Sequence, residues 1–330
     1  MTAGPPDVRS PLLVTGAAGF IGARFVESCN RRRLPIVAVD RLASFAERRE
    51  HCGLDFGTRI DIDALDAWLA AEPRALAGIV HLGACTDTTE MDVDYLRRVN
   101  LAYSQRLWRW ASERRVPFVY ASSAATYGAG AYGYDDDEAL VSKLRPLNPY
   151  GESKQQFDLW ALAEERAGRM PPAWSGFKFF NVYGFGERHK GKMASVVLHA
   201  FDQIRADGEV RLFKSYRPDI ADGAQRRDFV WVEDVVAVLH FALERPLARG
   251  LFNLGSGTSR TFLDLVHATF AALGMTPKIR FIDMPESLRA RYQYATEARM
   301  DRLRAAGWTA PFTTLEEGAR RYVARLLAAT

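Results

Sequence analysis

Near its amino terminus the chain reads Leu12-Leu13-Val14-Thr15-Gly16-Ala17-Ala18-Gly19-Phe20-Ile21-Gly22. The first four residues suit a strand buried in a parallel sheet, and the glycines that follow keep the spacing G-x-x-G-x-x-G. Residues 23–32 then have the pattern of an amphipathic helix. Glycines at such a junction allow a tight turn and let backbone amides approach a pyrophosphate. A flexible glycine turn is the alternative, but a strand, glycines and a helix in this order favour a nucleotide-binding βαβ unit.

The next apolar run, residues 36–39, ends at Asp40, about twenty residues after the glycines. An acidic residue at this place binds the ribose hydroxyls of an adenosine. Arg41 follows directly, and Arg48 and Arg49 come soon after. A 2′-phosphate needs such a cation, although solvated loop charges are the alternative. Asp40 therefore favours NAD and Arg41 favours NADP, and the residues leave both cofactors open.

Two further apolar runs predict strands that end in small or hydroxyl side chains. Residues 78–82 run into Gly83-Ala84-Cys85-Thr86, and residues 118–121 run into Ser122 and Ser123. Ligands of open α/β sheets bind at the carboxyl ends of the strands, so a cofactor is expected to lie close to the first segment. The two serines can hydrogen-bond a substrate oxygen, or they cap a turn. His81 is interpreted as a core histidine, and a single helix is expected from about residue 91 to 115.

Tyr150 and Lys154 stand at positions i and i+4 just after Pro149, a residue typical of the first helical position. The two side chains therefore share one helix face. A lysine ammonium beside a phenol favours the phenolate, so Lys154 is expected to lower the pKa of Tyr150 and make it a proton acceptor. An exposed helix with a tyrosine and a lysine on one face is the alternative.

The bulk composition excludes several classes of protein. The 330 residues suffice for a large α/β domain and a smaller one, and a net charge of +4 without a basic, aromatic-rich run argues against nucleic acid as a partner. The three cysteines have no ligand-like spacing, which predicts reduced thiols and no metal site. No apolar run is long enough for a bilayer span or a signal peptide, so a cytoplasmic protein without a membrane partner is expected.

The glycine motif, the strand-end Asp40, the serine pair and Tyr-x-x-x-Lys occur here in the order found in extended short-chain dehydrogenases/reductases. The chain resembles the nucleotide-sugar epimerases and dehydratases of that family, from about residue 12 to 325. Within it, several blocks are similar to the branch that epimerises ADP-linked heptoses. These blocks are His81–Glu90, Tyr120–Gly128, Phe180–Gly184, His189–Ser195, Arg227–Val230 and Arg291–Gln293.

The resemblance implies a Rossmann-type doubly wound parallel sheet and a smaller mixed α/β substrate-binding lobe. Its expected domains are residues 1–180, with 228–255 packing back on them, and a discontinuous substrate-binding domain, 181–330. Epimerisation at C6″ of an ADP-heptose follows, with bound NADP, for lipopolysaccharide inner-core precursor synthesis. A homo-oligomer is also implied, with a pentamer as the candidate form. A nucleotide-sugar 4-epimerase, a net oxidoreductase or dehydratase, and an inactive nucleotide-sensing module are the competing functions.

The resemblance carries over to individual residues. Catalytic roles fall on Tyr150, Lys190, Ser123 and Lys154. Contacts to the cofactor are implied for Gly16, Gly19, Phe20, Ile21, Gly22, Asp40, Arg41, Leu82, Gly83, Ala84, Cys85, Thr86, Asn100, Lys154, Val182 and Lys190. Contacts to the substrate are implied for Ser123, Asn181, Lys192, His199, Phe213, Arg227 and Tyr292.

Composition adds support for an amine at position 190. Only 7 of the 44 basic residues other than histidine are lysines, and Lys154, Lys190 and Lys192 are three of them. Lysine can give up a proton when its pKa is lowered, whereas arginine in a protein cannot. The resemblance assigns Lys190 as a second acid/base. Lys192 is a candidate for the diphosphate, and a mobile basic loop is the alternative for both.

Overall fold

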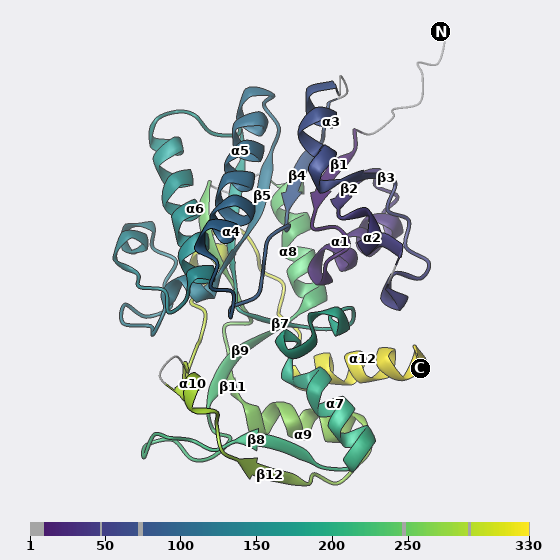
Figure 1. Cartoon of the computed structure of the whole chain (residues 1–330), viewed down its shortest axis with the longest axis vertical. Helices are drawn as coiled ribbons and strands as arrows, with labels where there is room; N and C mark the ends of the chain where they lie inside the picture. The colour runs from purple at the N-terminus through teal and green to yellow at the C-terminus, as the bar shows by residue number, and fades with distance from the viewer. Residues whose placement is uncertain (1–9, 47, 72–74, 246–248, 290–291, 330) are drawn as a thin grey trace.

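A computed structural model describes residues 10–46, 48–71, 75–245, 249–289 and 292–329. Arg291, part of one of the blocks above, lies outside the described residues. A seven-stranded parallel sheet forms the centre, in the order β10-β6-β5-β4-β1-β2-β3 (Figure 1). Its strands are β1 (Leu12–Thr15), β2 (Ile36–Asp40), β3 (Thr58–Asp61), β4 (Gly78–His81), β5 (Phe118–Ser123), β6 (Trp174–Phe179) and β10 (Gly250–Leu254). The predicted Rossmann-type sheet is confirmed.

Helices cover both faces of this sheet, as its apolar strands require. On one face α1 (Phe20–Arg31) and α8 (Val232–Glu244) enclose a core that contains Phe25 and Leu239. On the other face α3 (Leu65–Ala71), α5 (Tyr103–Glu113) and α6 (Pro149–Arg166) enclose a core around Trp108. The short helix α2 (Leu42–Ala46) follows β2. The carboxyl ends of β1, β4 and β5 are left open between these layers.

The helix expected over residues 91–115 is not a single regular helix. It consists of α4 (Val93–Leu96), a π-helical segment (Arg97–Ala102) and α5. The wider π turns place Asn100 at the buried inner side, where its side chain bonds the backbone of Cys85. Residue periodicity for an α-helix does not reveal such a local widening.

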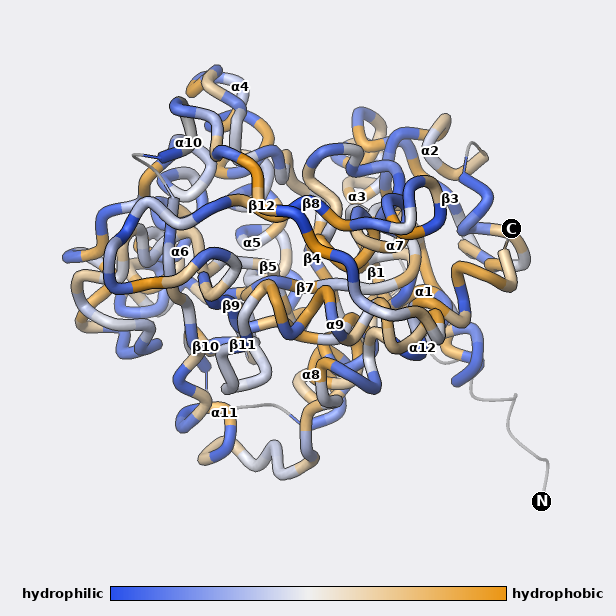
Figure 2. The backbone as a smooth tube through the Cα atoms, turned by 90° about the horizontal axis from the view of Figure 1, so that it is seen from below, coloured by the Kyte–Doolittle hydropathy of each residue, from blue (hydrophilic) through white to orange (hydrophobic). Residues whose placement is uncertain are grey.

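A smaller lobe lies beyond the carboxyl ends of the central strands (Figure 1). It contains the sheet β11-β9-β7 and the pair β12-β8. Its elements are β7 (Asn181–Tyr183), α7 (Val196–Asp207), β8 (Val210–Phe213), β9 (Arg226–Trp231), β11 (Ser259–Thr261), α9 (Phe262–Ala272), β12 (Ile279–Ile282), α10 (Glu286–Arg289) and α12 (Leu315–Ala328). Figure 2 views this lobe from below and shows the apolar residues of α9. They pack with α7 and α12 in a core of their own.

Between these lobe elements the chain returns to the central sheet. Helix α8 packs against α1, where Phe25 and His240 stack with ring centroids 4.5 Å apart. Strand β10 then pairs with β6. Helix α11 (Asp301–Ala305), which comes later in the chain, contacts β10. No helix among the described residues is both long and apolar enough to cross a membrane.

Candidate active site

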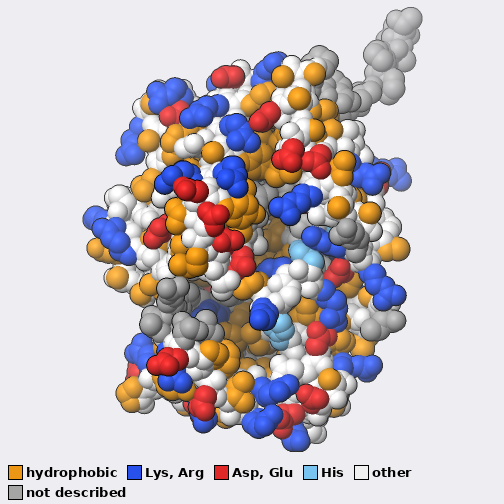
Figure 3. All heavy atoms as spheres, viewed as in Figure 1, with side chains coloured by type: hydrophobic (Ala, Val, Ile, Leu, Met, Phe, Trp, Pro, Cys, Tyr) orange, Lys and Arg blue, Asp and Glu red, His pale blue; other side chains and the backbone are white. Residues whose placement is uncertain are grey.

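A cavity of about 780 Å³ lies between the central sheet and the smaller lobe. In the space-filling view the molecule is hollowed there, and basic and histidine side chains lie along the hollow (Figure 3). Most of the residues expected from the sequence line this one cleft: Gly16, Gly19, Phe20, Ile21, Gly22, Asp40, Arg41, Leu82, Gly83, Ala84, Cys85, Thr86, Ser123, Tyr150, Lys154, Asn181, Val182, Lys190, Arg227 and Tyr292.

The glycine turn is packed so closely that side chains are excluded. Gly16 has a φ of +65°, and a Cβ added there would lie 2.7 Å from the backbone nitrogen of Gly83. A Cβ on Gly22 would lie 2.0 Å from the carbonyl oxygen of Gly16. The turn therefore offers bare backbone to the cleft at the start of α1, which fits a dinucleotide pyrophosphate.

Asp40 is fixed beside this turn by backbone donors. Its Oδ2 accepts a hydrogen bond of 3.0 Å from the amide of Ala18, and its Oδ1 accepts one of 2.9 Å from the amide of Arg41. Arg41, Ser44 and Arg48 line the same end of the cleft, and the Arg48 guanidinium donates to the carbonyl of Ala18. An acidic side chain and two guanidinium groups thus stand together where an adenosine ribose is expected.

Helix α6 begins as its sequence predicts and carries Tyr150 and Lys154 into the cleft. Asn148 caps it, accepting from the amide of Gly151 at 2.8 Å, and Pro149 occupies its first turn. The two side chains are each only 8% exposed. The Lys154 ammonium donates a 2.8 Å hydrogen bond to the carbonyl of Ala121 at the end of β5.

The prediction that Lys154 lowers the pKa of Tyr150 is wrong, because the pKa of Tyr150 is raised. Burial raises the pKa of Tyr150, and a hydrogen bond from the Ser123 hydroxyl acts in the opposite direction. Burial also lowers the pKa of Lys154 to about 8, and the charge of Asp158 opposes that shift. The phenol and the amine are both poorly solvated, so their proton affinities depend on the groups that surround them.

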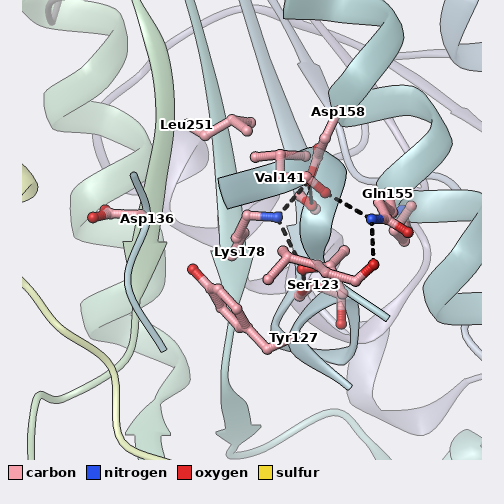
Figure 4. Close-up of polar contacts among 12 residues, drawn as sticks. Ser123, Tyr127, Asp136, Val141, Gln155, Asp158, Lys178 and Leu251 are labelled. Atoms are coloured by element: carbon pink, nitrogen blue, oxygen red, sulfur yellow. Dashed lines mark hydrogen bonds and ion pairs between the residues drawn. The ribbon is translucent and has the colours of Figure 1, made fainter. Parts of the chain in front are cut away.

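Asp158 and Lys178 form a buried ion pair behind these residues, which the sequence reasoning missed (Figure 4). The Lys178 ammonium lies 2.6 Å from Oδ2 of Asp158 and also donates to the Thr126 hydroxyl at 2.8 Å. The carboxylate accepts from the hydroxyls of Tyr120 and Ser122 at 2.9 and 2.8 Å. The pair therefore joins α6, β5 and β6 behind the cleft. A lysine in the apolar run of β6, and an acid one turn after Lys154, were the available signals.

We expect Lys178→Met to lower the free energy of unfolding by about 3–5 kcal/mol, because it leaves Asp158 buried without its counter-ion. Urea unfolding followed by circular dichroism measures the loss. The double variant Lys178→Met, Asp158→Leu removes both charges and should recover much of it. A single variant as stable as the wild-type protein would show that Asp158 is not charged in the folded chain.

Lys190 reaches the cleft from a short 3₁₀-helical segment, Arg188–Met193, that is kinked at Gly191. Gly191 has a φ of +52° in this segment, a value that favours glycine and that kinks the chain directly after Lys190. The Lys190 ammonium lies 5.4 Å from the ring centroid of Phe20 in the glycine turn. Burial lowers the pKa of Lys190, which brings the amine closer to proton exchange at neutral pH.

The residues expected to contact a substrate divide between two adjoining cavities. Asn181 and Arg227 line the main cleft, His199 and Phe213 line a second cavity of about 590 Å³, and Tyr292 lines both. The Arg227 guanidinium lies 5.2 Å from the ring centroid of Tyr292, and this arginine is 8% exposed. A planar cation at the junction suits a diphosphate. The main cleft and the second cavity together have room for a second ligand beside the nicotinamide end of a dinucleotide.

Two expected contacts lie outside both cavities. Asn100 is buried behind the cleft, and besides Cys85 it bonds the Ser153 hydroxyl at 2.9 Å. Lys192 is exposed and belongs to the lining of neither cavity. His81 is a satisfied core histidine as interpreted, because its ring bonds Thr15 at 2.6 Å and Ser104 at 2.8 Å.

The chain is similar to known proteins in both sequence and fold. Residues 12–255 match the model of the NAD dependent epimerase/dehydratase family. The chain is 46% identical to an ADP-L-glycero-D-manno-heptose-6-epimerase of Nitratidesulfovibrio vulgaris, over 96% of this chain and 98% of the relative. The crystal structure of the Helicobacter pylori ADP-L-glycero-D-manno-heptose-6-epimerase is similar over 97% of both chains, with a TM-score of 0.78 and 25% identity. The structure of MoeE5 with UDP-glucuronic acid and NAD covers 97% of this chain and 100% of its own, with a TM-score of 0.75 and 26% identity.

Proposed function

Because the chain belongs to the NAD dependent epimerase/dehydratase family, we propose that it interconverts ADP-D-glycero- and ADP-L-glycero-D-manno-heptose. The relatives that carry this activity in their names match nearly the whole chain. The observation that carries the proposal is the presence of two proton-transfer groups in one cleft, Tyr150 from α6 and Lys190 from the turn before α7. A dehydrogenase needs one such group, whereas two groups fit the two orientations that a carbonyl adopts during inversion.

We propose NADP as the bound cofactor. The glycine turn would hold its pyrophosphate, Asp40 and Arg41 its adenosine ribose and 2′-phosphate, and Lys154 its nicotinamide ribose. The bare backbone at Gly16 and Gly22 supports this fit, as does the pair of guanidinium groups beside Asp40. When bound, the nicotinamide supplies reversible removal of hydride from a carbinol carbon, and it is regenerated in each cycle.

The chain's own residues handle the proton and the orientation of the substrate. C6″ carries no acidic proton, so its hydroxyl must lose a proton as the carbon is oxidised to a ketone. Tyr150 accepts that proton as its phenolate in one orientation of the sugar, and Ser123 hydrogen-bonds the oxygen. The positive charge of an oxidised nicotinamide would favour the phenolate against the effect of burial. After rotation about C5″–C6″, hydride would return to the opposite face of C6″, and Lys190, as its ammonium, would give a proton to the same oxygen. Proton exchange with solvent would then restore the Tyr150 phenolate and the Lys190 ammonium. In the reverse direction the two groups exchange roles.

Interconversion of the two ADP-heptose epimers tests the proposal. Purified protein with its bound cofactor is incubated with either epimer, and the products are separated by anion-exchange chromatography. We expect both epimers to reach the same equilibrium mixture without net change in nicotinamide absorbance. Loss of water in the product would indicate a dehydratase, and turnover of UDP-hexoses alone would indicate a 4-epimerase. No turnover of any of these would leave a nucleotide-sensing module.

We further propose that Arg41 sets the preference for NADP. Arg41→Ala should weaken binding of NADP about 10- to 100-fold relative to NAD, since a charge-assisted hydrogen bond contributes about 1.5–3 kcal/mol. Isothermal titration of protein stripped of cofactor measures both affinities. Arg205→Ala, an exposed arginine on α7, is the control. An equal loss of affinity for NAD and NADP would show that Arg41 contacts a part of the dinucleotide other than the 2′-phosphate.

The same relationship supports two wider proposals. We propose that the product serves assembly of the lipopolysaccharide inner core in the cytoplasm, as the heptose substrate suggests. We also propose that the chain forms a homo-oligomer, with a pentamer as the candidate form. Light scattering after size-exclusion chromatography measures the number of subunits.

A further inference from the structure

A buried carboxylate begins the turn that carries Lys190. Glu187 is 0% exposed, yet its two oxygens accept four hydrogen bonds. Oε2 accepts from the amide of Ser195 at 2.7 Å, and Oε1 accepts from the hydroxyl of the same residue at 2.5 Å. Oε1 also accepts from the Tyr322 hydroxyl at 3.1 Å and from the amide of Gly184 at 3.4 Å. Burial raises the pKa of this carboxyl group, whereas the charge of Lys190 and the hydrogen bonds from Ser195 and Gly184 oppose that shift and favour the ionised form.

These contacts close the turn on itself. Glu187 precedes the segment 188–194 and Ser195 follows it, so one carboxylate joins both ends. Ser195 is also the N-cap of α7, and Tyr322 lies on α12 near the end of the chain. Within the turn the amide of Lys190 donates to the carbonyl of Glu187 at 2.9 Å. The position of Lys190 in the cleft therefore depends on this carboxylate and on two helices of the smaller lobe.

The charge of Glu187 also acts on the amine. Burial lowers the pKa of Lys190, and the negative charge of Glu187 opposes that shift. No ion pair joins the two side chains in the described part of the chain, so the effect acts through space. Burial lowers the pKa of the neighbouring His189 to about 4, which leaves it uncharged at neutral pH. Other charged or ionisable groups around the turn are Lys192 within it, the Arg188–Asp202 ion pair, Arg48, Glu50, His51 and Tyr322.

We propose that Glu187 is a positioning residue for Lys190: its carboxylate joins the two ends of the turn that carries the amine into the cleft, and it places a carboxyl group close to that amine. The inference rests on the proposed role of Lys190 as the second acid/base, and it concerns a residue that does not touch the substrate. Among the groups that act on the pKa of Lys190, Glu187 is the anion that favours the charged amine. Loss of the Glu187 carboxylate would therefore favour the neutral form of Lys190. A smaller fraction of Lys190 would then carry the proton that it must donate to the substrate oxygen.

Competitive labelling of lysines tests the electrostatic part without reference to catalysis. Trace acetic anhydride is added between pH 7 and 10 to the wild-type protein and to the variants Glu187→Gln and Glu187→Asp. Mass spectrometry then measures the acetylation of Lys190 relative to that of the exposed Lys192. Only neutral amines react, so Lys190 of Glu187→Gln should react roughly threefold to tenfold faster at pH 7.5 than in wild type. Glu187→Asp keeps the charge and should stay close to wild type. Asp136→Asn, at an equally buried carboxylate elsewhere, is the control.

A second pair of variants tests the geometric part. Ser195→Ala removes the hydroxyl that closes the turn and should lower kcat at least about tenfold with little change in KM, and Ser195→Thr should restore it. The Ser195 pair keeps this part testable even if Glu187→Gln does not fold. Equal labelling of Lys190 in wild type and Glu187→Gln, or an unchanged kcat in Ser195→Ala, would overturn the proposal. Absence of epimerisation in the wild-type protein would instead contradict the proposed function, and the labelling result would still stand.

Discussion

Tyr150→Phe should lower the rate of epimerisation by about 10²- to 10⁴-fold, the usual contribution of a positioned proton-transfer group. The substitution removes one buried oxygen and keeps the ring that packs in the cleft. It leaves the Ser123 hydroxyl without the phenol, but Ser123 still accepts from the amide of Ala125 at 3.1 Å. The fold and the bound cofactor should therefore survive, and the loss should appear in kcat.

The measurement follows interconversion of the two ADP-heptose epimers by proton NMR at several substrate concentrations. Cofactor content, released by heat and measured by chromatography, shows whether the site remains loaded. Tyr132→Phe serves as the control, since that tyrosine is 49% exposed. If Tyr150→Phe retains a rate within tenfold of wild type, the phenol is not the proton acceptor of either half-reaction.

Lys190→Met should cause a loss of the same size. Methionine keeps most of the length of the side chain and its contact with the ring of Phe20, but it has no proton to exchange. Because each half-reaction uses a different group, removal of either one blocks the complete inversion. This is the main difference expected from a simple dehydrogenase, in which only the tyrosine is indispensable.

Lys278→Met, at an exposed lysine of the smaller lobe, is the matched control and should behave as wild type. A further readout is the oxidised intermediate: a variant that lacks only one group should still exchange hydride with one epimer and should release traces of ketone. Wild-type turnover in Lys190→Met would reject the two-group scheme, and Tyr150 alone would then have to serve both orientations of the sugar.

Several features of the site follow from spacing within one element. The glycines at 16, 19 and 22 predict a close turn, because a Cβ at two of them would overlap backbone atoms. Pro149 predicts the start of α6, and the i, i+4 spacing then places Tyr150 and Lys154 on one face. Asp40 lies at the end of β2 because the apolar run that precedes it is a strand. Each of these inferences needs only the helix or strand period and the shape of a residue.

Other features required the packing of distant segments. Lys178 and Asp158 are 20 residues apart, and Glu187 and Tyr322 are 135 apart. The residues themselves can be noticed locally, as the lysine in the apolar run of β6 shows, but neither pairing can be read from the sequence, because the partners meet only after the sheet and the helices have assembled. The π-helical turns at Asn100 likewise depend on a backbone partner at Cys85.

The chain's own order of residues determined its nucleotide-binding fold, the family it belongs to and the side chains that meet at the strand ends. Only the tertiary structure decided how those side chains behave. Lys190 and Lys192 are two residues apart in one basic turn, yet one enters the cleft and the other is exposed. Tyr150 has a raised pKa in spite of the nearby lysine. Burial in the cleft shifts the pKa of both Lys190 and Tyr150, because the free energy of a charged group depends on how much solvent the whole fold leaves around it.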